Sequence, residues 1–146
     1  MGHPEPLVVV AAVDGSPASL AAVQRSLDLA ARGLPVDLVL VNVQPPPTLY
    51  EVVVAHDRER LDDLRAAAGA DLLAPALALA RAAGLEPRHD VIGGDPADAI
   101  VEFAETTGAN LLVLGQRDTD GGAATLGATA RQVLERAPMP VMVVRG

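Results

Sequence analysis

Four short apolar runs constrain the fold of this chain more than any other feature of its sequence. They are Leu7–Val13, Val36–Val43, Leu111–Leu114 and Val141–Val144, and Val and Leu are their commonest residues. The runs are largely continuous rather than strictly alternating, which is typical of parallel strands that helices cover on both faces. The chain is therefore expected to adopt an α/β fold.

A helix is expected directly after the first run. The turn Asp14–Pro17 places Ser16 or Asp14 at the cap position and Pro17 in the first turn. The predicted buried stripe of this helix comprises Leu20, Val23, Leu27 and either Ala30 or Ala31.

The middle of the chain is harder to interpret. Leu49–Ala55 is apolar and partly β-branched, so it fits a short strand, a covering loop or a first helical turn, and the last two are favoured. Asp57–Ala83 has a helical pattern in which Gly69 and Pro75 predict a break or kink. Leu85–Ile92 alternates, which indicates a strand near the edge of the sheet.

A further helix is expected to begin with Asp95 as its N-cap and to bury Ile100, Phe103 and Ala104. The whole pattern gives five βα-type repeats with right-handed crossovers. The predicted architecture is one doubly wound domain over residues 1–146. It has a five-stranded parallel sheet in the order 3-2-1-4-5, with helices on both faces.

The composition narrows the class of partner. The formal net charge is −8 and every basic residue is Arg, so neither nucleic acid nor an anionic membrane is an expected partner. The chain has no Cys, which excludes thiol catalysis, cysteine metal sites and disulfides. No apolar stretch approaches about 20 residues, and the start MGHPEP lacks the pattern of a signal peptide. We therefore expect a cytoplasmic protein.

The stretch Asn110–Leu134 has the arrangement of an anion-binding site. It joins an apolar strand through a glycine-containing loop to a helix, so backbone N–H groups converge where the strand ends. In open α/β sheets, ligands bind beyond the strand C-termini where the winding reverses. There Asp14 is expected to face the loop after Gly115, and it could hold a ribose hydroxyl or Mg²⁺. Equally, Asp14 could cap a helix and the loop could be a plain connection.

Four segments resemble the universal stress protein family: AAVDGSPAS at 11–19, GGDPADAI at 93–100, ANLLVLGQR at 109–117 and LGATARQVLERAPMPVMVV at 126–144. The resemblance runs through nearly the whole chain in order, although residues 45–83 match only in length and helical character. It implies the doubly wound fold. Members of that family divide into those that bind ATP and those that do not.

The resemblance also supplies a marker for ATP binding, which reads Gly, two residues, Gly, nine residues, Gly, then Ser or Thr. The marker begins here at Gly115, but Asp118 occupies the position of the second glycine. The third glycine is Gly127, one residue early, and Ala128 replaces Ser or Thr, with Thr129 one position late. These departures remove a phosphate contact and add like charge, so they predict ATP binding weakened by about a hundredfold.

Two further contacts are implied by the resemblance. Arg117 could still meet a phosphate, and the backbone of Val43, at the end of the second strand, would hold adenine. ATP or AMP is the candidate ligand, with Mg²⁺ if the nucleotide is ATP. The candidate binding residues are Asp14, Val43, Gly115, Arg117, Gly127, Ala128 and Thr129.

Three functions compete at this point. The first is binding of ATP or AMP that is read out through dimer state or partner contacts, and the second is a dimeric interaction module that binds no nucleotide. An enzyme is the third, but His3, His56 and His89 lack metal-ligand spacing and Ser16 is not in a nucleophile elbow. We expect a stress-response regulatory module with weakened nucleotide binding and no catalytic residues. Slow ATP hydrolysis stays open.

The last predicted strand, Val141–Val144, favours self-association. It is short and apolar and is expected at a sheet edge, where it can pair with its own copy across a two-fold axis. The resemblance implies the same, since family members commonly dimerise through the final strand. We expect a homodimer. The alternative is an edge strand that its own helices cover.

Overall fold

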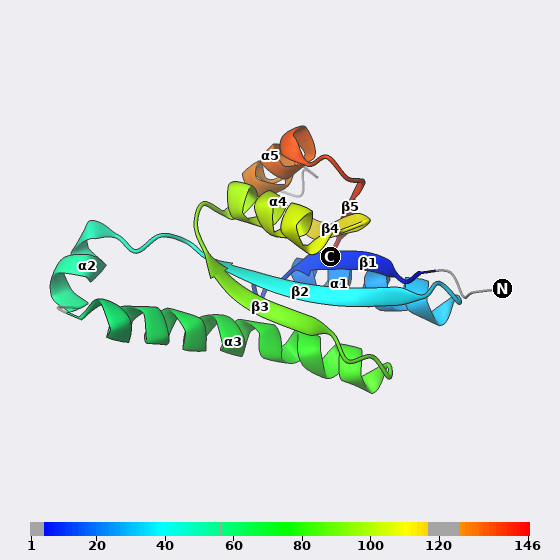
Figure 1. The fold of residues 1–146 in the computed structure, drawn as a ribbon, viewed down its shortest axis with the longest axis horizontal. Helices are drawn as coiled ribbons and strands as arrows, with labels where there is room; N and C mark the ends of the chain where they lie inside the picture. Colours follow the sequence, from blue (N-terminus) through cyan, green and yellow to red (C-terminus); the bar gives the residue numbers. More distant parts are fainter. Residues whose placement is uncertain (1–4, 56, 117–125) are drawn as a thin grey trace.

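The computed structural model describes residues 5–55, 57–116 and 126–146, and within them five parallel strands form a sheet in the order β3-β2-β1-β4-β5 (Figure 1). The predicted strand order and the parallel orientation are confirmed. The strands are β1 (Leu7–Ala12), β2 (Val36–Gln44), β3 (Arg88–Gly93), β4 (Leu111–Gln116) and β5 (Val141–Arg145).

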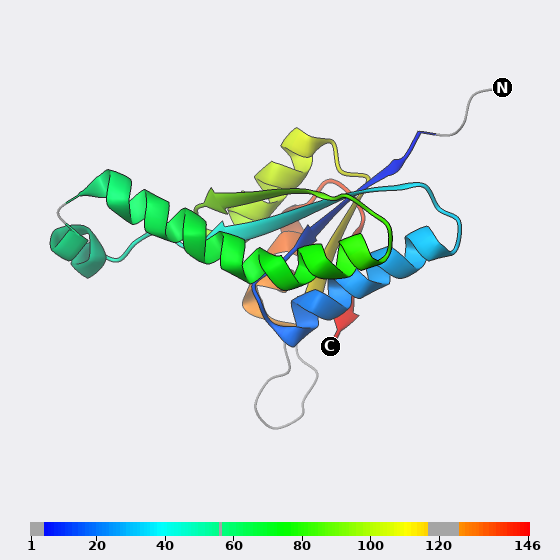
Figure 2. The same ribbon diagram turned by 90° about the horizontal axis from the view of Figure 1, so that it is seen from below.

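Helices cover both faces of this sheet, as predicted. On one face lie α1 (Pro17–Ala31) and α3 (Arg58–Ala82), and on the other lie α4 (Pro96–Thr107) and α5 (Ala128–Arg136) (Figure 1). The short helix α2 (Leu49–Ala55) lies away from the sheet, beside the N-terminal end of α3 (Figure 2). The doubly wound α/β fold therefore carries one projecting segment.

The central strands send alternate side chains into two apolar layers. Val9, Ala11 and Val113 pack in the layer toward α1 and α3, whereas Val10 and Leu112 pack in the layer toward α4 and α5. All five are fully buried. Because both faces of these strands are covered, their sequences read as continuous apolar runs rather than as alternating ones.

α1 begins where the turn chemistry predicts. Ser16, one of the two candidate caps, accepts a hydrogen bond from the backbone N–H of Ser19 at 3.1 Å. The carboxylate of Asp14 instead accepts a bond from the N–H of Ser16 at 2.9 Å. Helix capping therefore belongs to Ser16, and Asp14 holds the turn that precedes the helix.

The buried face of α1 is rotated from the predicted stripe. Val23 and Leu27 are buried as predicted. Leu20 is only partly buried but packs against the core, whereas Ala30 is partly buried and Ala31 is exposed. Small residues take the inner positions because the helix lies tightly against β4: a Cβ on Gly115 would be 2.3 Å from the backbone of Ala18. The buried residues of α1 are Ala18, Ser19, Ala22, Val23, Ser26 and Leu27.

α3 is one uninterrupted helix, so the predicted break does not occur. Gly69 is a packing position: a Cβ there would lie 2.4 Å from Cγ1 of Val91 and 2.9 Å from Oδ1 of Asn42. Pro75 lies on the exposed side of the helix, where water can bind the carbonyl that loses its N–H partner. Tertiary packing therefore explains both residues that suggested a break.

The predicted start of β3 and the predicted burial of Phe103 also need correction. β3 is an edge strand as predicted, but it begins at Arg88, because the N–H of Leu85 donates to the carbonyl of Ala80 at 3.0 Å and closes α3 instead. In α4, Asp95 occupies the N-cap position without a side-chain hydrogen bond. Phe103, predicted to be buried, is only partly so, because the smaller aliphatic residues of α4 face the sheet.

Leu49–Ala55 forms a helix, which agrees with one of the two favoured interpretations and excludes the strand. It does not act as a cover. Leu49 and Tyr50 are 80% and 76% exposed. The segment thus presents its apolar residues to solvent.

Candidate functional site

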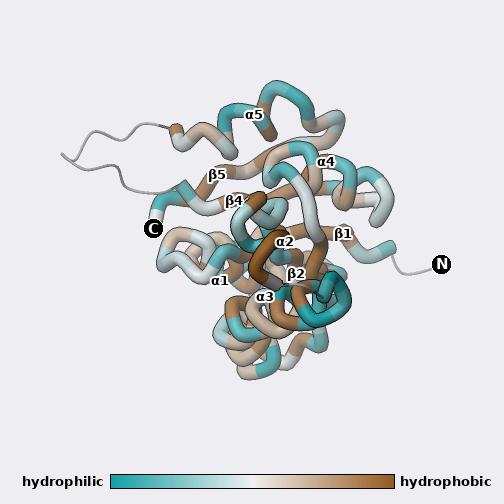
Figure 3. Tube along the Cα trace, turned by 90° about the vertical axis from the view of Figure 1, so that its left-hand side faces the viewer, coloured by the Kyte–Doolittle hydropathy of each residue, from teal (hydrophilic) through white to brown (hydrophobic). Residues whose placement is uncertain are grey.

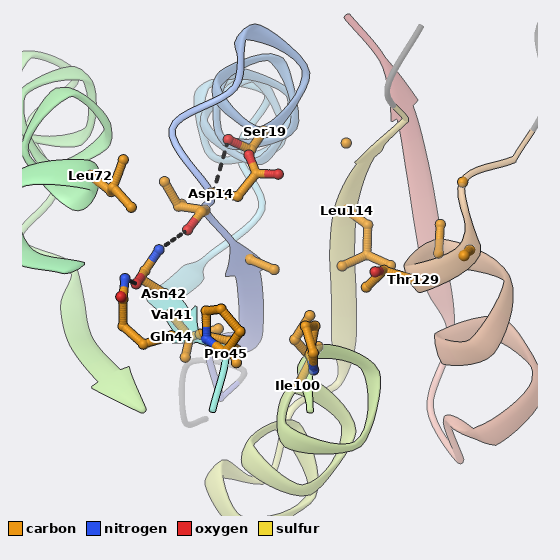
Figure 4. A pocket seen from close by; sticks show the side chains of 18 residues that line it. Asp14, Ser19, Val41, Asn42, Gln44, Pro45, Leu72, Ile100, Leu114 and Thr129 are labelled. Carbon is orange, nitrogen blue, oxygen red and sulfur yellow. Dashed lines mark hydrogen bonds between the residues drawn. The ribbon is translucent and has the colours of Figure 1, made fainter. Parts of the chain in front are cut away.

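The C-terminal ends of β1, β2 and β4, with the first residues of α4 and α5, enclose a cavity of about 620 Å³ (Figure 4). Small-molecule sites are commonly about 300–1,000 Å³. The cavity lies where the chain leaves β1 for one side of the sheet and β4 for the other. This is the point of reversed winding at which the sequence predicts a ligand.

One wall of the cavity is apolar and comes from the sheet and α4. Val41, Val43, Leu114 and Ile100 line it. All four belong to, or pack against, the core between the sheet and the α4–α5 layer. A flat apolar group can therefore be buried against this wall without separating a polar group of the protein from its partner.

Two amide side chains close the side of the cavity toward α3. Asn42, which is 1% exposed, donates from Nδ2 to the carbonyl of Val13 at 2.8 Å. Its Oδ1 accepts a bond from Nε2 of Gln44 at 2.8 Å (Figure 4). These two bonds connect the end of β1 to the end of β2 and fix the orientation of the Asn42 amide. Sequence reasoning missed both residues, although amides in an otherwise apolar strand were a signal.

Asp14 stands between β1 and α1 and lines the cavity. Its backbone N–H donates to Oγ of Ser19 at 3.3 Å (Figure 4), and its carboxylate accepts from the N–H of Ser16. A carboxylate held in this way presents a fixed acceptor to hydroxyl groups of a ligand. Asp14 is expected from the sequence to face the loop after Gly115; Gly115 itself lines the same cavity as Asp14, whereas residues 117–125 of that loop lie outside the described residues.

Gly115 has a structural role that is independent of any ligand. A Cβ at this position would lie 2.3 Å from the carbonyl carbon of Ala18 and 2.6 Å from the backbone nitrogen of Ser19. Both distances are shorter than any carbon contact that a protein tolerates, so a side chain here would displace α1 from β4. A substitution of Gly115 therefore tests packing as much as binding.

The N-terminus of α5 faces the cavity from the opposite side. Its N-cap is Gly127, which has no side chain to accept a hydrogen bond from the first turn. Gly127, Ala128, Thr129 and Ala130 all line the cavity. Because the first N–H groups of a helix have no intrahelical acceptor, they can bind an anion there. The backbone does not require glycine at 127, since φ is −62° and a Cβ would meet nothing within 4 Å.

The predicted binding residues Asp14, Val43, Gly115, Gly127, Ala128 and Thr129 thus surround one cavity. Arg117 and the marker position Asp118 lie outside the described residues.

The polar character of the lining comes mainly from neutral groups. Among the lining residues that the structure describes, Asp14 alone carries an ionisable side chain. Within residues 5–55, 57–116 and 126–146, no group of three His, Asp or Glu side chains is placed to hold a metal ion. None of the helices in these ranges is long and apolar enough to cross a membrane.

Known proteins resemble this chain over almost its entire length. The universal stress protein MJ0531 of Methanocaldococcus jannaschii is 28% identical over 138 residues, which are 94% of this chain and 81% of that protein. A universal stress protein solved in complex with cAMP is 26% identical, with a TM-score of 0.64, and the match covers 94% of this chain and 95% of that one.

A third relative supports the fold. The universal stress protein of Archaeoglobus fulgidus, solved in complex with dAMP, is 23% identical, with a TM-score of 0.66 over 96% of this chain and 98% of that one. The sequence model of the universal stress protein family matches residues 8–145. Because that match spans nearly the whole chain, the protein belongs to the universal stress protein family.

Proposed function

We propose that this protein binds an adenine mononucleotide in the cavity and acts in the stress response as a homodimeric regulatory module with no catalytic step of its own. The observation that carries the proposal is the apolar wall with Asp14 on one side and the N-terminus of α5 on the other. A base, a sugar and a phosphate need these three environments in turn. The relative solved with cAMP, at 26% identity, supports this ligand class.

Each part of the nucleotide is assigned to a region of the lining. Adenine packs on the wall formed by Leu114 and Ile100, with the backbone of Val43 at its edge. Asp14 accepts hydrogen bonds from the ribose hydroxyls. The phosphate accepts bonds from the N–H groups that begin α5, from Ala128 to Ala130, near Gly115. Arg117, two residues after Gly115 in the sequence, is proposed as a further phosphate contact.

A monophosphate fits this lining better than ATP does. The N–H groups of one helical turn can satisfy one phosphate, whereas a triphosphate brings further negative charge near Asp14. Asp118, at a position of the ATP marker, adds another negative charge to the sequence of the loop. We therefore expect ATP to bind at least tenfold more weakly than AMP, with Mg²⁺ reducing this difference.

Calorimetric titration of nucleotide-free protein with AMP, cAMP and ATP, with and without Mg²⁺, tests the proposal. We expect micromolar binding of AMP or cAMP and about a 10–100-fold loss on Asp14→Asn, since hydrogen bonds to a charged group contribute about 1.5–3 kcal/mol. Glu102→Gln, on the exposed side of α4, is the charge-matched control and should bind as the wild type does. Absence of binding at millimolar concentrations of all three nucleotides would refute nucleotide binding and leave an interaction module.

The dimer is assigned to β5, the edge strand next to β4. Val141, Met142 and Val143 are only partly buried, so a second copy could cover them while it completes the ladder. Val143→Pro removes a ladder donor and should convert the dimer formed through β5 into monomer, as measured by light scattering. An unchanged mass would exclude β5 as the interface.

The absence of a catalytic step is tested separately. Saturating Mg-ATP is incubated with the protein, and phosphate release is measured over hours. We expect release that Asp14→Asn does not change. Turnover that is lost in this variant would instead support the alternative, which is an ATP-binding protein that slowly hydrolyses its ligand.

A further inference from the structure

The N-terminal part of α3 and the whole of α2 extend beyond the sheet as an arm (Figures 1 and 2). We define the arm as residues 49–54 and 58–68. All four buried residues of α3 lie at or after Gly69, where the helix packs against Val91. At 1.5 Å per residue, the helix continues for about 16 Å past this last buried residue toward its N-terminus.

The arm exposes more large apolar side chains than is usual for a segment in contact with water. In α2, Leu49, Tyr50, Val52, Val53 and Val54 are between 52% and 80% exposed. Figure 3 shows this apolar segment on the side of the molecule that faces the viewer. Large contiguous apolar patches on otherwise polar surfaces mark interaction sites.

An apolar stripe continues from the arm along α3. Leu61, Leu64, Ala68, Leu72 and Pro75 follow one another at intervals of three, four, four and three residues, which is the spacing of the seam in a pair of helices. Leu64 is 59% exposed and Leu72 is 36% exposed. The stripe ends beside the cavity, since Leu72 packs over Gly15 and also lines the cavity (Figure 4).

The direction of the arm is fixed by a contact beside the stripe. The guanidinium of Arg65 donates to the carbonyl of Gln44 at 3.0 Å and to the carbonyl of Pro45. These carbonyls follow β2, so the arm is tied to the same strand end that forms the cavity. The stripe is thereby held outward in a defined orientation.

Charges beside the stripe are complementary to those of a second copy. Arg60 and Asp71 are separated by three helical turns and lie on the same side of the stripe. Within the described residues neither side chain has an ion-pair partner. When two α3 helices pack antiparallel across a two-fold axis near residue 66, Arg60 of each copy meets Asp71 of the other. Leu64 then faces Ala68, a large residue against a small one.

We propose that two copies of this chain pair through their arms, with the α3 stripes antiparallel. The pairing would cover the exposed apolar residues of α2 together with the stripe of α3. A membrane is a poorer occupant because six acidic residues accompany three arginines between Glu51 and Asp71. The interface is isologous, as a two-fold pairing requires.

The pairing would bring the partner's α2 to the cavity. In the antiparallel arrangement, the tip of one arm lies beside Leu72 and Pro75 of the other copy, and Leu72 lines the cavity. The partner thus completes the site on the side of α3. The arm packs beside β2 and β3, whereas β5 is the opposite edge strand of the sheet, so the two pairings use different surfaces and can occur together. The effect on the ligand rests on the proposed function, whereas the pairing itself does not.

Exchange of charge across the axis is the decisive test. Sedimentation velocity is measured without nucleotide, both in the wild type and with Val143→Pro to remove pairing through β5. We expect Arg60→Asp or Asp71→Arg to raise the dissociation constant of the arm dimer at least tenfold, because each reversal places two like-charge pairs in the interface. The double variant should restore it to within about threefold. An equimolar mixture of the two single variants should also associate, since it restores both pairs.

The control and the contrary outcomes are equally specific. Arg32→Asp, an exposed charge after α1, should not change association. Equal association of both single variants and the wild type would overturn the arm pairing. A folded Val143→Pro protein that stays monomeric over a 100-fold range of concentration, up to about 100 μM, would overturn it as well. In the wild-type background, the same reversals should remove every assembly larger than the dimer formed through β5, so a failure of the β5 pairing is recognised separately.

Tyr50 gives a second measurement. It is the sole Tyr, and the chain has no Trp, so tyrosine fluorescence reports on α2 directly. We expect acrylamide quenching of Tyr50 to fall by at least half on association and to remain high at all concentrations in Leu64→Asp. Leu134→Asp, at an exposed apolar position on α5, is the matched control. AMP that binds equally to associated wild type and to Arg60→Asp would refute completion of the site, and association without AMP binding would refute only the proposed function.

Discussion

The two halves of α3 share one helical backbone but differ in almost every tertiary contact. The second half, from Gly69 to Ala82, packs on the sheet and includes Leu73, Ala76 and Ala80, each fully buried. The first half, from Arg58 to Ala68, has no buried residue. Alanine is abundant in both halves, so both are helical. Local sequence therefore decides whether this segment is helical, while contact with the sheet decides which part of it belongs to the core.

The first half therefore depends on local interactions and one anchor. Asp57 caps the helix by accepting bonds from the N–H groups of Glu59 at 3.0 Å and Arg60 at 3.4 Å. Beyond this cap, Arg65 supplies the contact with the end of β2. Such segments open with free energies well below that of global unfolding. The two halves should consequently respond very differently to the same substitution.

Truncation of one leucine in each half should give the largest contrast. Leu73 is fully buried, so Leu73→Ala removes its packing and leaves a cavity, at a cost of about 2–5 kcal/mol. Leu64 is 59% exposed, and Leu64→Ala should change the free energy of unfolding by no more than about 0.5 kcal/mol. Urea unfolding at low protein concentration measures both. Equal losses would mean that the arm is packed as tightly as the rest of the helix.

Gly69 marks the boundary between the halves, and Gly69→Ala should have an intermediate effect. Alanine favours a helix by about 1 kcal/mol over glycine, but its Cβ would lie 2.4 Å from Cγ1 of Val91. Overpacking usually costs about 1–3 kcal/mol, so we expect net destabilisation of about 1 kcal/mol in urea unfolding. Ala68→Gly, one residue earlier on the exposed side, should be destabilising for the opposite reason, namely loss of helix propensity. A gain in stability with Gly69→Ala would show that the contact is loose.

The same boundary explains which parts of the fold the sequence could predict. Strand order and layers follow from short-range patterns, such as the continuous run at Leu7–Val13 and the turn at Ser16, because these reflect burial and capping in the immediate neighbourhood. The break expected at Gly69 was wrong because the contact with Val91 is distant in sequence. No local sequence pattern shows that the absence of a side chain at Gly69 leaves room for Val91 of β3.

The candidate site, like the fold, could be predicted only in part. Asp14 and Gly127 could be brought to one cavity by topology alone, since parallel strands place their C-terminal ends together. Asn42 and Gln44 could not, because a polar residue within a strand gains meaning only when its partner is known. Here that partner is the carbonyl of Val13, supplied by the neighbouring strand.

The anchor of the arm offers the smallest but most selective effect. Arg65→Met keeps an apolar stem and removes the bonds to the carbonyls of Gln44 and Pro45, which should cost about 1 kcal/mol at this partly exposed site. Because the second half stays packed, we expect little change in global unfolding and at least fivefold faster amide hydrogen exchange in residues 58–68, measured by mass spectrometry. Arg58→Met, at an exposed position of the same helix, is the control. Equal exchange in the wild type and Arg65→Met would mean that the arm holds its direction through helix propensity and capping alone, so the first half would be a rigid extension of the second rather than a separately anchored segment.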